Sequence, residues 1–279
     1  MGLERADGRF WADRCLVRCN LRLPLRTRLG HKWRWGNEGW APREMQEKTL
    51  EEIFRDICSV EWPLRERLEA FSRAVRELGL PFAEAYDELV ARLKTGQAGA
   101  GAPAPGDVMP LFALPDTKGH LVGLADLLEA GPVDISFNRG HWCEYCAIEL
   151  SALRQALNEV AAQGASVVSI MPESQEFISI AGANHANAFT ILSDIENSYA
   201  LTVGLVIWLG DRVRKLYQEH GLHLDQYQRS GAWFVPIPAT FVVASDGRIV
   251  SRFVDPDFRT RMEIDDIIAA LKAAQPSSH

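Results

Sequence analysis

The 279-residue chain has few cysteines, no long apolar run and no excess of basic charge. Five cysteines are too few, and an odd number, for the framework of a disulfide-rich secreted protein. No apolar stretch reaches the roughly 20 residues that a membrane-spanning helix needs, and arginines interrupt every apolar run near the N-terminus, unlike a secretory signal. The net charge of −7 argues against nucleic acid as the main partner, because phosphate binding needs a basic face. We therefore expect a cytoplasmic protein with reduced thiols.

Common cofactor motifs are absent as well. The sequence contains no GxGxxG loop, P-loop, HExxH or GxSxG motif. We therefore expect no organic cofactor and no catalytic metal. The apolar fraction of 47% and the charged fraction of 24% are those of an ordinary globular protein of one or two domains.

Charge is unevenly distributed along the chain. Residues 1–44 carry ten Lys and Arg against five Asp and Glu, and they hold four of the eight tryptophans. Three interpretations stay open: a start codon assigned too early, a disordered basic tail, or an extension that binds an anionic partner. Cys15 and Cys19 lie here at CxxxC spacing, which by itself is a weak metal signal. If the first interpretation is right, translation from Met45 gives a folded, active protein.

Apolar residues at spacings of three and four predict three helices over residues 45–94. This region is interpreted as a cap or a dimerisation arm, so a homodimer is one expected arrangement. Residues 95–106 (TGQAGAGAPAPG) have the composition of a linker.

From residue 107 onward, short strands alternate with helices. Strands are expected at 133–137, 166–171 and 189–192, and a hairpin is expected from 240–243 and 249–253. A helix at 264–271 completes the pattern. This order predicts an α/β domain over residues 107–275, a thioredoxin-like mixed sheet flanked by helices.

Cys143 and Cys146, in the run FNRGHWCEYC (residues 137–146), form the most informative pair. They follow the strand 133–137 and precede a helical pattern at 147–162, so both sulfurs are expected on the first helical turn. Unpaired N–H groups and the helix dipole stabilise a thiolate there, and the thiolate is the reactive form of cysteine. Residues three apart share a helix face and can close a disulfide. The spacing predicts a redox-active dithiol.

The pair also has structural interpretations: two ordinary cysteines, or half of a zinc site. Zinc would require further ligands, such as His141 together with His185, His220 or His223.

The side chains next to the two cysteines can likewise be interpreted as structural or as functional. Arg139 is either a structural arginine at a strand end or part of the active site. His141 is either a partly exposed loop residue or a proton carrier. Trp142 is expected to pack over the sulfurs. A further cluster is expected to lie in the core, or alternatively to form a surface for a hydrophobic substrate or a dimer: Trp208, Trp233 and Phe234.

Several segments, in order, resemble peroxiredoxin-like proteins of the alkyl hydroperoxide reductase/thiol-specific antioxidant (AhpC/TSA) class, within the thioredoxin superfamily. The segments are residues 106–115 (GDVMPLFALP), 137–146, 236–241 (PIPATF) and 253–257 (FVDPD). The resemblance spans roughly residues 105–271 and implies thiol-dependent reduction of hydroperoxides.

The resemblance assigns the cysteines in two ways. In the thioredoxin pattern Cys143 attacks and Cys146 resolves. In the peroxiredoxin pattern Cys146, followed by Glu149, is the peroxidatic residue, and Cys143 replaces the usual Thr. Glu149 could instead act only through the helix dipole. Pro238 matches the cis-proline that faces the dithiol in thioredoxin-like folds, and the arginine that peroxiredoxins have at that position is missing. The order of attack therefore stays open.

Two departures lie inside the motif. Glu144 stands where relatives usually have Pro, and Asn138 where they have Tyr. A carboxylate beside the sulfurs should disfavour the thiolate, whereas Arg139 and a protonated His141 should favour it.

The predicted function is that of a thiol-dependent antioxidant enzyme whose CxxC pair cycles between dithiol and disulfide. Its substrates would be hydroperoxides or disulfides, and a thiol or a thioredoxin-type protein would reduce it. The alternatives are a general protein disulfide oxidoreductase and a non-enzymatic redox sensor.

Overall fold

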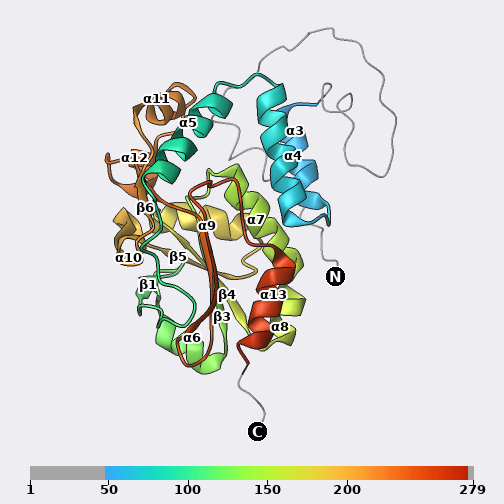
Figure 1. Cartoon of the computed structure of the whole chain (residues 1–279), viewed down its shortest axis with the longest axis vertical. Helices are drawn as coiled ribbons and strands as arrows, with labels where there is room; N and C mark the ends of the chain where they lie inside the picture. Colours follow the sequence, from blue (N-terminus) through green and yellow to red (C-terminus); the bar gives the residue numbers. More distant parts are fainter. Residues whose placement is uncertain (1–47, 276–279) are drawn as a thin grey trace.

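The computed structural model describes residues 48–275 (Figure 1). Residues 1–44, with Cys15 and Cys19, lie outside the described residues, so their three interpretations stay predictions. Across residues 48–275, every helix is too short or too polar to cross a bilayer.

A five-stranded mixed sheet forms the centre of the molecule, in the order β5-β4-β3-β8-β9. The strands are β3 (Val133–Phe137), β4 (Ser166–Met171), β5 (Thr190–Ser193), β8 (Ala239–Val243) and β9 (Ile249–Val254). β3, β4 and β5 run parallel, whereas β8 pairs antiparallel with both β3 and β9. All five residues of β3 are buried, because this strand lies in the middle of the sheet with helices over both faces. The predicted thioredoxin-like mixed sheet flanked by helices is confirmed.

Two apolar clusters pack on the sheet. The smaller one joins residues of α7 (Glu144–Gln155), α8 (Leu157–Ala162), α9 (Gln175–Asn184) and α13 (Ile264–Ala273) to Val242 of β8. The larger one includes Leu124 of α6 (Leu124–Ala130) and the rings of Phe137 and Phe241. The helix predicted at 147–162 begins three residues earlier, and it is divided at Ala156 into α7 and α8.

Three N-terminal helices form an arm beside α7: α3 (Leu50–Ser59), α4 (Leu64–Glu77) and α5 (Phe82–Thr95) (Figure 1). α3 begins with a capping box between Thr49 and Glu52, in which each side chain accepts a hydrogen bond from the other residue's backbone N–H. α3 and α4 pack against α7, and α5 packs against α11 (Asp211–Glu219). The arm therefore covers the dithiol helix of its own chain.

Charged contacts connect the arm to the C-terminal part of the chain. The carboxylate of Glu263 accepts hydrogen bonds from the backbone N–H groups of Leu64, at 3.1 Å, and Arg65, at 2.8 Å. An anion at the start of α4 satisfies N–H groups that have no partner within the helix. Arg259 contacts Asp87 of α5 at 2.7 Å and Asp257 at 2.8 Å.

Two small two-stranded antiparallel sheets and three short helical elements complete the described chain. They are β1 (Ala113–Pro115) with β2 (Leu121–Gly123), β6 (Val206–Trp208) with β7 (Phe234–Pro236), η1 (Ile195–Asn197), α10 (Ser198–Thr202) and α12 (Leu224–Gln228). Trp233 is buried, but Trp208 and Phe234 are 39% and 43% exposed. The prediction that all three lie in the core is wrong for Trp208 and Phe234, which face each other across the β6–β7 pair.

The predicted boundaries 45–94, 95–106 and 107–275 lie close to changes of structure at the end of α5 and the start of β1. As domain limits they stay predictions.

Candidate active site

Cys143 is the N-cap residue of α7, and Cys146 lies in its first turn. The backbone of Cys143 is extended, with φ −91° and ψ 108°, and its Sγ accepts a hydrogen bond from the N–H of Cys146 at 3.4 Å. Ser, Thr, Asp and Asn usually fill this position, because an oxygen there satisfies an unpaired backbone N–H. A sulfur takes that role here, and a thiolate is a better acceptor than a thiol. The helix start therefore favours an ionised Cys143.

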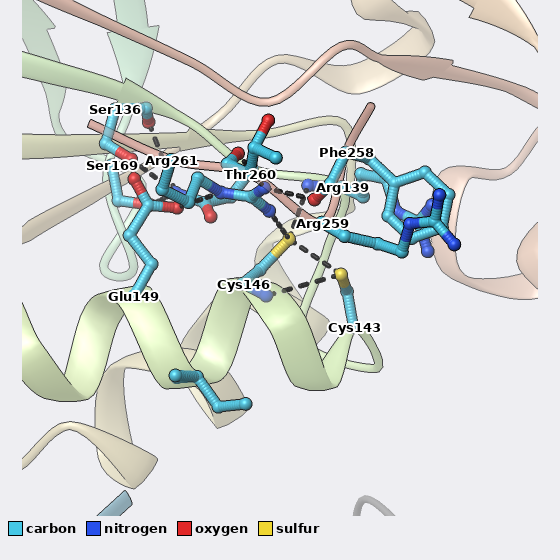
Figure 2. Close-up of polar contacts among 12 residues, drawn as sticks. Ser136, Arg139, Cys143, Cys146, Glu149, Ser169, Phe258, Arg259, Thr260 and Arg261 are labelled. Carbon is cyan, nitrogen blue, oxygen red and sulfur yellow. Dashed lines mark hydrogen bonds and ion pairs between the residues drawn. The ribbon is translucent and has the colours of Figure 1, made fainter. Parts of the chain in front are cut away.

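The two sulfurs lie 2.7 Å apart and point in the same direction from α7 (Figure 2). Burial opposes ionisation of both. For Cys143, the hydrogen bond from Cys146 and the positive charges of Arg139 and Arg261 outweigh burial and lower the pKa to about 5. For Cys146, burial and the neighbouring Cys143 raise the pKa well above its ordinary value. These shifts favour a state of the pair in which Cys146 holds the proton and Cys143 holds the negative charge.

Arg261 supplies a cation to Cys146 that sequence reasoning missed. Its Nη2 lies 3.6 Å from the sulfur of Cys146, and its Nε lies 2.7 Å from Oε2 of Glu149 (Figure 2). Its Nη1 donates to the carbonyl oxygens of Phe258 and Thr260. The segment between β9 and α13 thus brings an arginine to the dithiol, whereas position 238 holds a proline. No motif marks this segment as catalytic, and only the folded chain brings it to the dithiol.

Glu149 is buried between Arg261 and the sheet rather than exposed at the helix start. Its Oε1 accepts a hydrogen bond from Ser136 at 3.1 Å, and burial raises its pKa in spite of Arg261. Of the two roles considered for Glu149, these contacts favour more than an effect on the helix dipole, because its carboxyl group is the partner of a buried guanidinium. Asn138 continues this network by donating to Ser136 at 2.8 Å and to Ser169 at 3.1 Å.

Arg139 is also buried, with 1% of its surface exposed, but no carboxylate among the described residues forms an ion pair with it. Its guanidinium lies over the ring of Phe258 at 3.9 Å and over Trp142 at 5.0 Å. Its Nη2 donates to the hydroxyl of Tyr217 at 3.0 Å, whereas Nε and Nη1 have no hydrogen-bond partner. An uncompensated buried cation favours a nearby anion. The positive charge of Arg139 lowers the pKa of Cys143, so the two side chains interact electrostatically.

His141 lies on the loop just before the dithiol and is held by Glu173. Its Nδ1 is 2.7 Å from Oε1 of Glu173, and its backbone N–H donates to Oε2 at 2.8 Å. The ring also stacks on Phe177 and meets Tyr227 edge-on. These contacts fix the path of the loop, with a buried carboxylate as its anchor.

The helices of the arm cover the site. Cys143 and Cys146 are each 1% exposed. Tyr145, between the two cysteines, accepts or donates a hydrogen bond at 3.1 Å with Ser72 of α4 and packs edge-on against Phe71. Trp142 is buried against Tyr217, which contacts Tyr86 of α5 through a hydroxyl–hydroxyl hydrogen bond of 3.1 Å. Trp142 thus packs beside the sulfurs within an aromatic enclosure.

Pro238 is buried at the start of β8, but the peptide bond before it is trans. The prediction of a cis-proline at this position is therefore wrong. The sequence motif does not fix the isomer, because an X–Pro bond prefers trans by only about 0.5–1 kcal/mol and packing decides between the two forms.

The histidines that a zinc site would need lie elsewhere. His220 packs on Phe82, and His185 packs on Phe189. Within residues 48–275 no three or more His, Cys, Asp or Glu side chains gather as metal ligands would.

Comparison with known proteins agrees with this geometry. Residues 105–252, more than half of the chain, match the AhpC/TSA family. The peroxiredoxin Bcp of Escherichia coli K12 is 27% identical over 169 residues, which are 60% of this chain and 94% of the relative. Among solved structures, the peroxidoxin BcpB of Mycobacterium tuberculosis aligns with a TM-score of 0.49 and 22% identity, over 62% of this chain and 99% of that one. The predicted peroxiredoxin-like class is confirmed, and the chain belongs to the AhpC/TSA family of thiol peroxidases.

Proposed function

We propose that this enzyme reduces hydroperoxides with Cys143 as the attacking thiol and Cys146 as the resolving thiol. The observation that carries this proposal is the asymmetry of the pair. Cys143 accepts the N–H of Cys146 at the start of α7, and its pKa is lowered to about 5, whereas the pKa of Cys146 is raised. A thiolate is the nucleophile in such reactions, so the ionised sulfur attacks first.

The reaction proceeds in two chemical steps. The thiolate of Cys143 attacks the terminal oxygen of R–O–O–H, so an S–O bond forms and the O–O bond breaks. The sulfur is oxidised to a sulfenic acid, and the substrate is reduced to the alkoxide R–O⁻. Cys146, 2.7 Å away, then displaces the sulfenic hydroxyl, which leaves as water with the Cys146 proton, and a disulfide forms.

An external dithiol, either a small thiol or a thioredoxin-type protein, would return the disulfide to the dithiol. A small thiol reaches the buried sulfurs with less movement of the arm than a protein does. The cytoplasmic location and the homodimer stay predictions.

The test is peroxide consumption in a single turnover, with the wild type compared with Cys143→Ser and Cys146→Ser. We expect Cys143→Ser to be inactive and Cys146→Ser to complete one oxidation, stopping at a sulfenic acid that a dimedone probe traps. The reverse pattern would make Cys146 the attacking residue, as in the peroxiredoxin alignment.

A second function, reduction of protein disulfides, is favoured by the CxxC spacing at the start of α7. The burial of both sulfurs under the arm disfavours it, because any protein partner, a thioredoxin-type reductant included, reaches a sulfur that is 1% exposed only after the arm moves, whereas a small hydroperoxide needs less room. Insulin reduction without peroxide consumption would support this second function.

A further inference from the structure

A small cavity lies beside the dithiol turn, between α7 and the arm. Its volume is about 40 Å³, which is room for about two or three water-sized groups. Its walls are mostly apolar and come from Phe71 and Val75 of α4 and Phe82 of α5. These helices precede the stretch of chain that matches the AhpC/TSA family, so the cavity is a feature that the arm adds.

Glu144 brings a carboxyl group into this cavity from the residue next to Cys143. The side chain makes no ion pair with any residue in the part of the chain that the structure describes. The apolar surroundings raise its pKa to about 7, and the negative charge of Cys143 acts in the same direction. About half of the Glu144 carboxyl groups are therefore protonated near pH 7, and most are protonated at pH 6.

The charged and titratable groups that face Glu144 come from every side of the cavity. Cys143 and Tyr145 flank it on α7, and Arg139 comes from the preceding loop. Tyr86 of α5 and Tyr217 of α11 face it from the arm and from the insertion. Burial raises the pKa of all three tyrosines, so none of them donates a proton more readily than the carboxyl does.

We propose that Glu144 is the general acid of the peroxide reaction, protonating the oxygen that leaves when Cys143 attacks. This inference rests on the proposed function, because it concerns the leaving group of that reaction. The alkoxide R–O⁻ takes the proton of the Glu144 carboxyl, which gives R–OH and the Glu144 carboxylate. Without a donor, a strongly basic alkoxide or hydroxide would have to form beside a sulfur that is 1% exposed.

The proton transfer also keeps Arg139 beside an anion throughout the cycle. Before the reaction the negative charge is on Cys143, and afterwards it is on Glu144, and both groups interact with the Arg139 guanidinium. When a dithiol reductant, 2 R′SH, reduces the disulfide, one of its two protons goes to Cys146 and the other to Glu144. The enzyme then again holds a Cys143 thiolate, a Cys146 thiol and a protonated Glu144.

The test compares two small oxidants in single-turnover oxidation of the full-length wild type and Glu144→Gln at pH 6. Hydrogen peroxide releases strongly basic hydroxide, whereas peracetic acid releases weakly basic acetate, which needs no proton donor. We expect Glu144→Gln to slow oxidation by hydrogen peroxide on the order of 10²-fold, the usual size of general acid catalysis, and to change the peracetic acid rate by less than about threefold. Glu144→Asp, which keeps a carboxyl on a shorter side chain, should recover part of the hydrogen peroxide rate.

The pH profile gives a second readout. The wild-type rate with hydrogen peroxide should fall above pH 7, as Glu144 loses its proton, and this fall should be absent in Glu144→Gln. Alkylation by iodoacetamide is the folding control, because iodide leaves without a proton, and Glu144→Gln should be alkylated at least as fast as the wild type.

Equal slowing with both oxidants, or an unchanged alkaline limb in Glu144→Gln, would overturn the role of Glu144 and leave the proposed function intact. A wild type that reacts with neither oxidant would instead overturn the proposed function itself.

Discussion

A buried arginine lies on each side of the dithiol, and the two arginines have different surroundings. On the Cys146 side, Arg261 is paired with Glu149 at 2.7 Å and bound to two carbonyl oxygens. On the Cys143 side, Arg139 has two aromatic rings and one tyrosine hydroxyl, and two of its nitrogens have no partner. Both guanidiniums are more than nine-tenths buried.

The difference indicates separate roles for the two arginines. The charge of Arg261 is compensated by Glu149 whatever the state of the sulfurs, so this pair acts mainly as structure. The charge of Arg139 is compensated only when an anion is present on Cys143 or Glu144. We therefore propose Arg139 as the main cation that favours the reactive thiolate, with Arg261 as the second.

The largest effect should be a loss of stability when the Arg261–Glu149 ion pair is broken. Arg261→Met leaves the Glu149 carboxylate buried without its partner, so we expect the free energy of unfolding to fall by about 3–5 kcal/mol. Urea unfolding monitored by tryptophan fluorescence measures this loss. The matched control is the double variant Arg261→Met/Glu149→Met, in which both charges are replaced. It should recover most of the stability that Arg261→Met loses. A double variant no more stable than the single one would contradict the pairing.

The next largest effect should be a change in the pKa of Cys143 when Arg139 is replaced. Arg139→Met removes a buried cation rather than a partner of one, so the protein should fold, but the pKa of Cys143 should rise by about 1–3 units. Iodoacetamide alkylation of Cys143 followed by mass spectrometry across pH 4–9 gives this pKa. Arg139→Lys, which retains the charge, should shift it less. An unchanged pKa in Arg139→Met would show that Arg261 alone supplies the positive charge.

The pH dependence of Cys143 alkylation in the wild type is the baseline for the comparison with Arg139→Met. With the pKa of Cys143 lowered to about 5, the thiolate fraction is nearly complete above pH 6 and is lost as the pH falls through 5. Alkylation should therefore be constant between pH 6 and 8, where an ordinary thiol with a pKa near 8.5 would still be gaining reactivity. A rate that rises tenfold per pH unit across this range would contradict a thiolate at Cys143.

The smallest effect should come from Tyr217→Phe, which removes the one side-chain hydrogen bond of Arg139 and its link to Tyr86. We expect a loss of about 1 kcal/mol in the free energy of unfolding, typical of one hydrogen bond. The alkylation pKa of Cys143 should change little, because the charge of Arg139 remains. A shift as large as that of Arg139→Met would mean that Tyr217 positions the guanidinium.

Local patterns predicted the parts of the site that lie close together in the chain. The apolar run of β3, the helical spacing after it and the CxxC between them placed Cys143 and Cys146 at a helix start, and Trp142 beside them. Pro238 was placed next to a strand, but its isomer was not, because one packing contact can outweigh the small intrinsic preference of an X–Pro bond. Trp208 and Phe234 were misplaced because large apolar residues are often partly exposed in small two-stranded sheets.

The sequence by itself thus determined the family, the mixed sheet and a dithiol at the mouth of a helix, since these depend on periodicity and on contacts within one turn of chain. Only the tertiary structure decided which charged groups surround the two sulfurs. That depends on Arg261, brought from 115 residues away, on the pairing of Glu149, and on an arm that excludes water from the site. Charges act through space in a low dielectric, and their distances are set by packing rather than by sequence spacing.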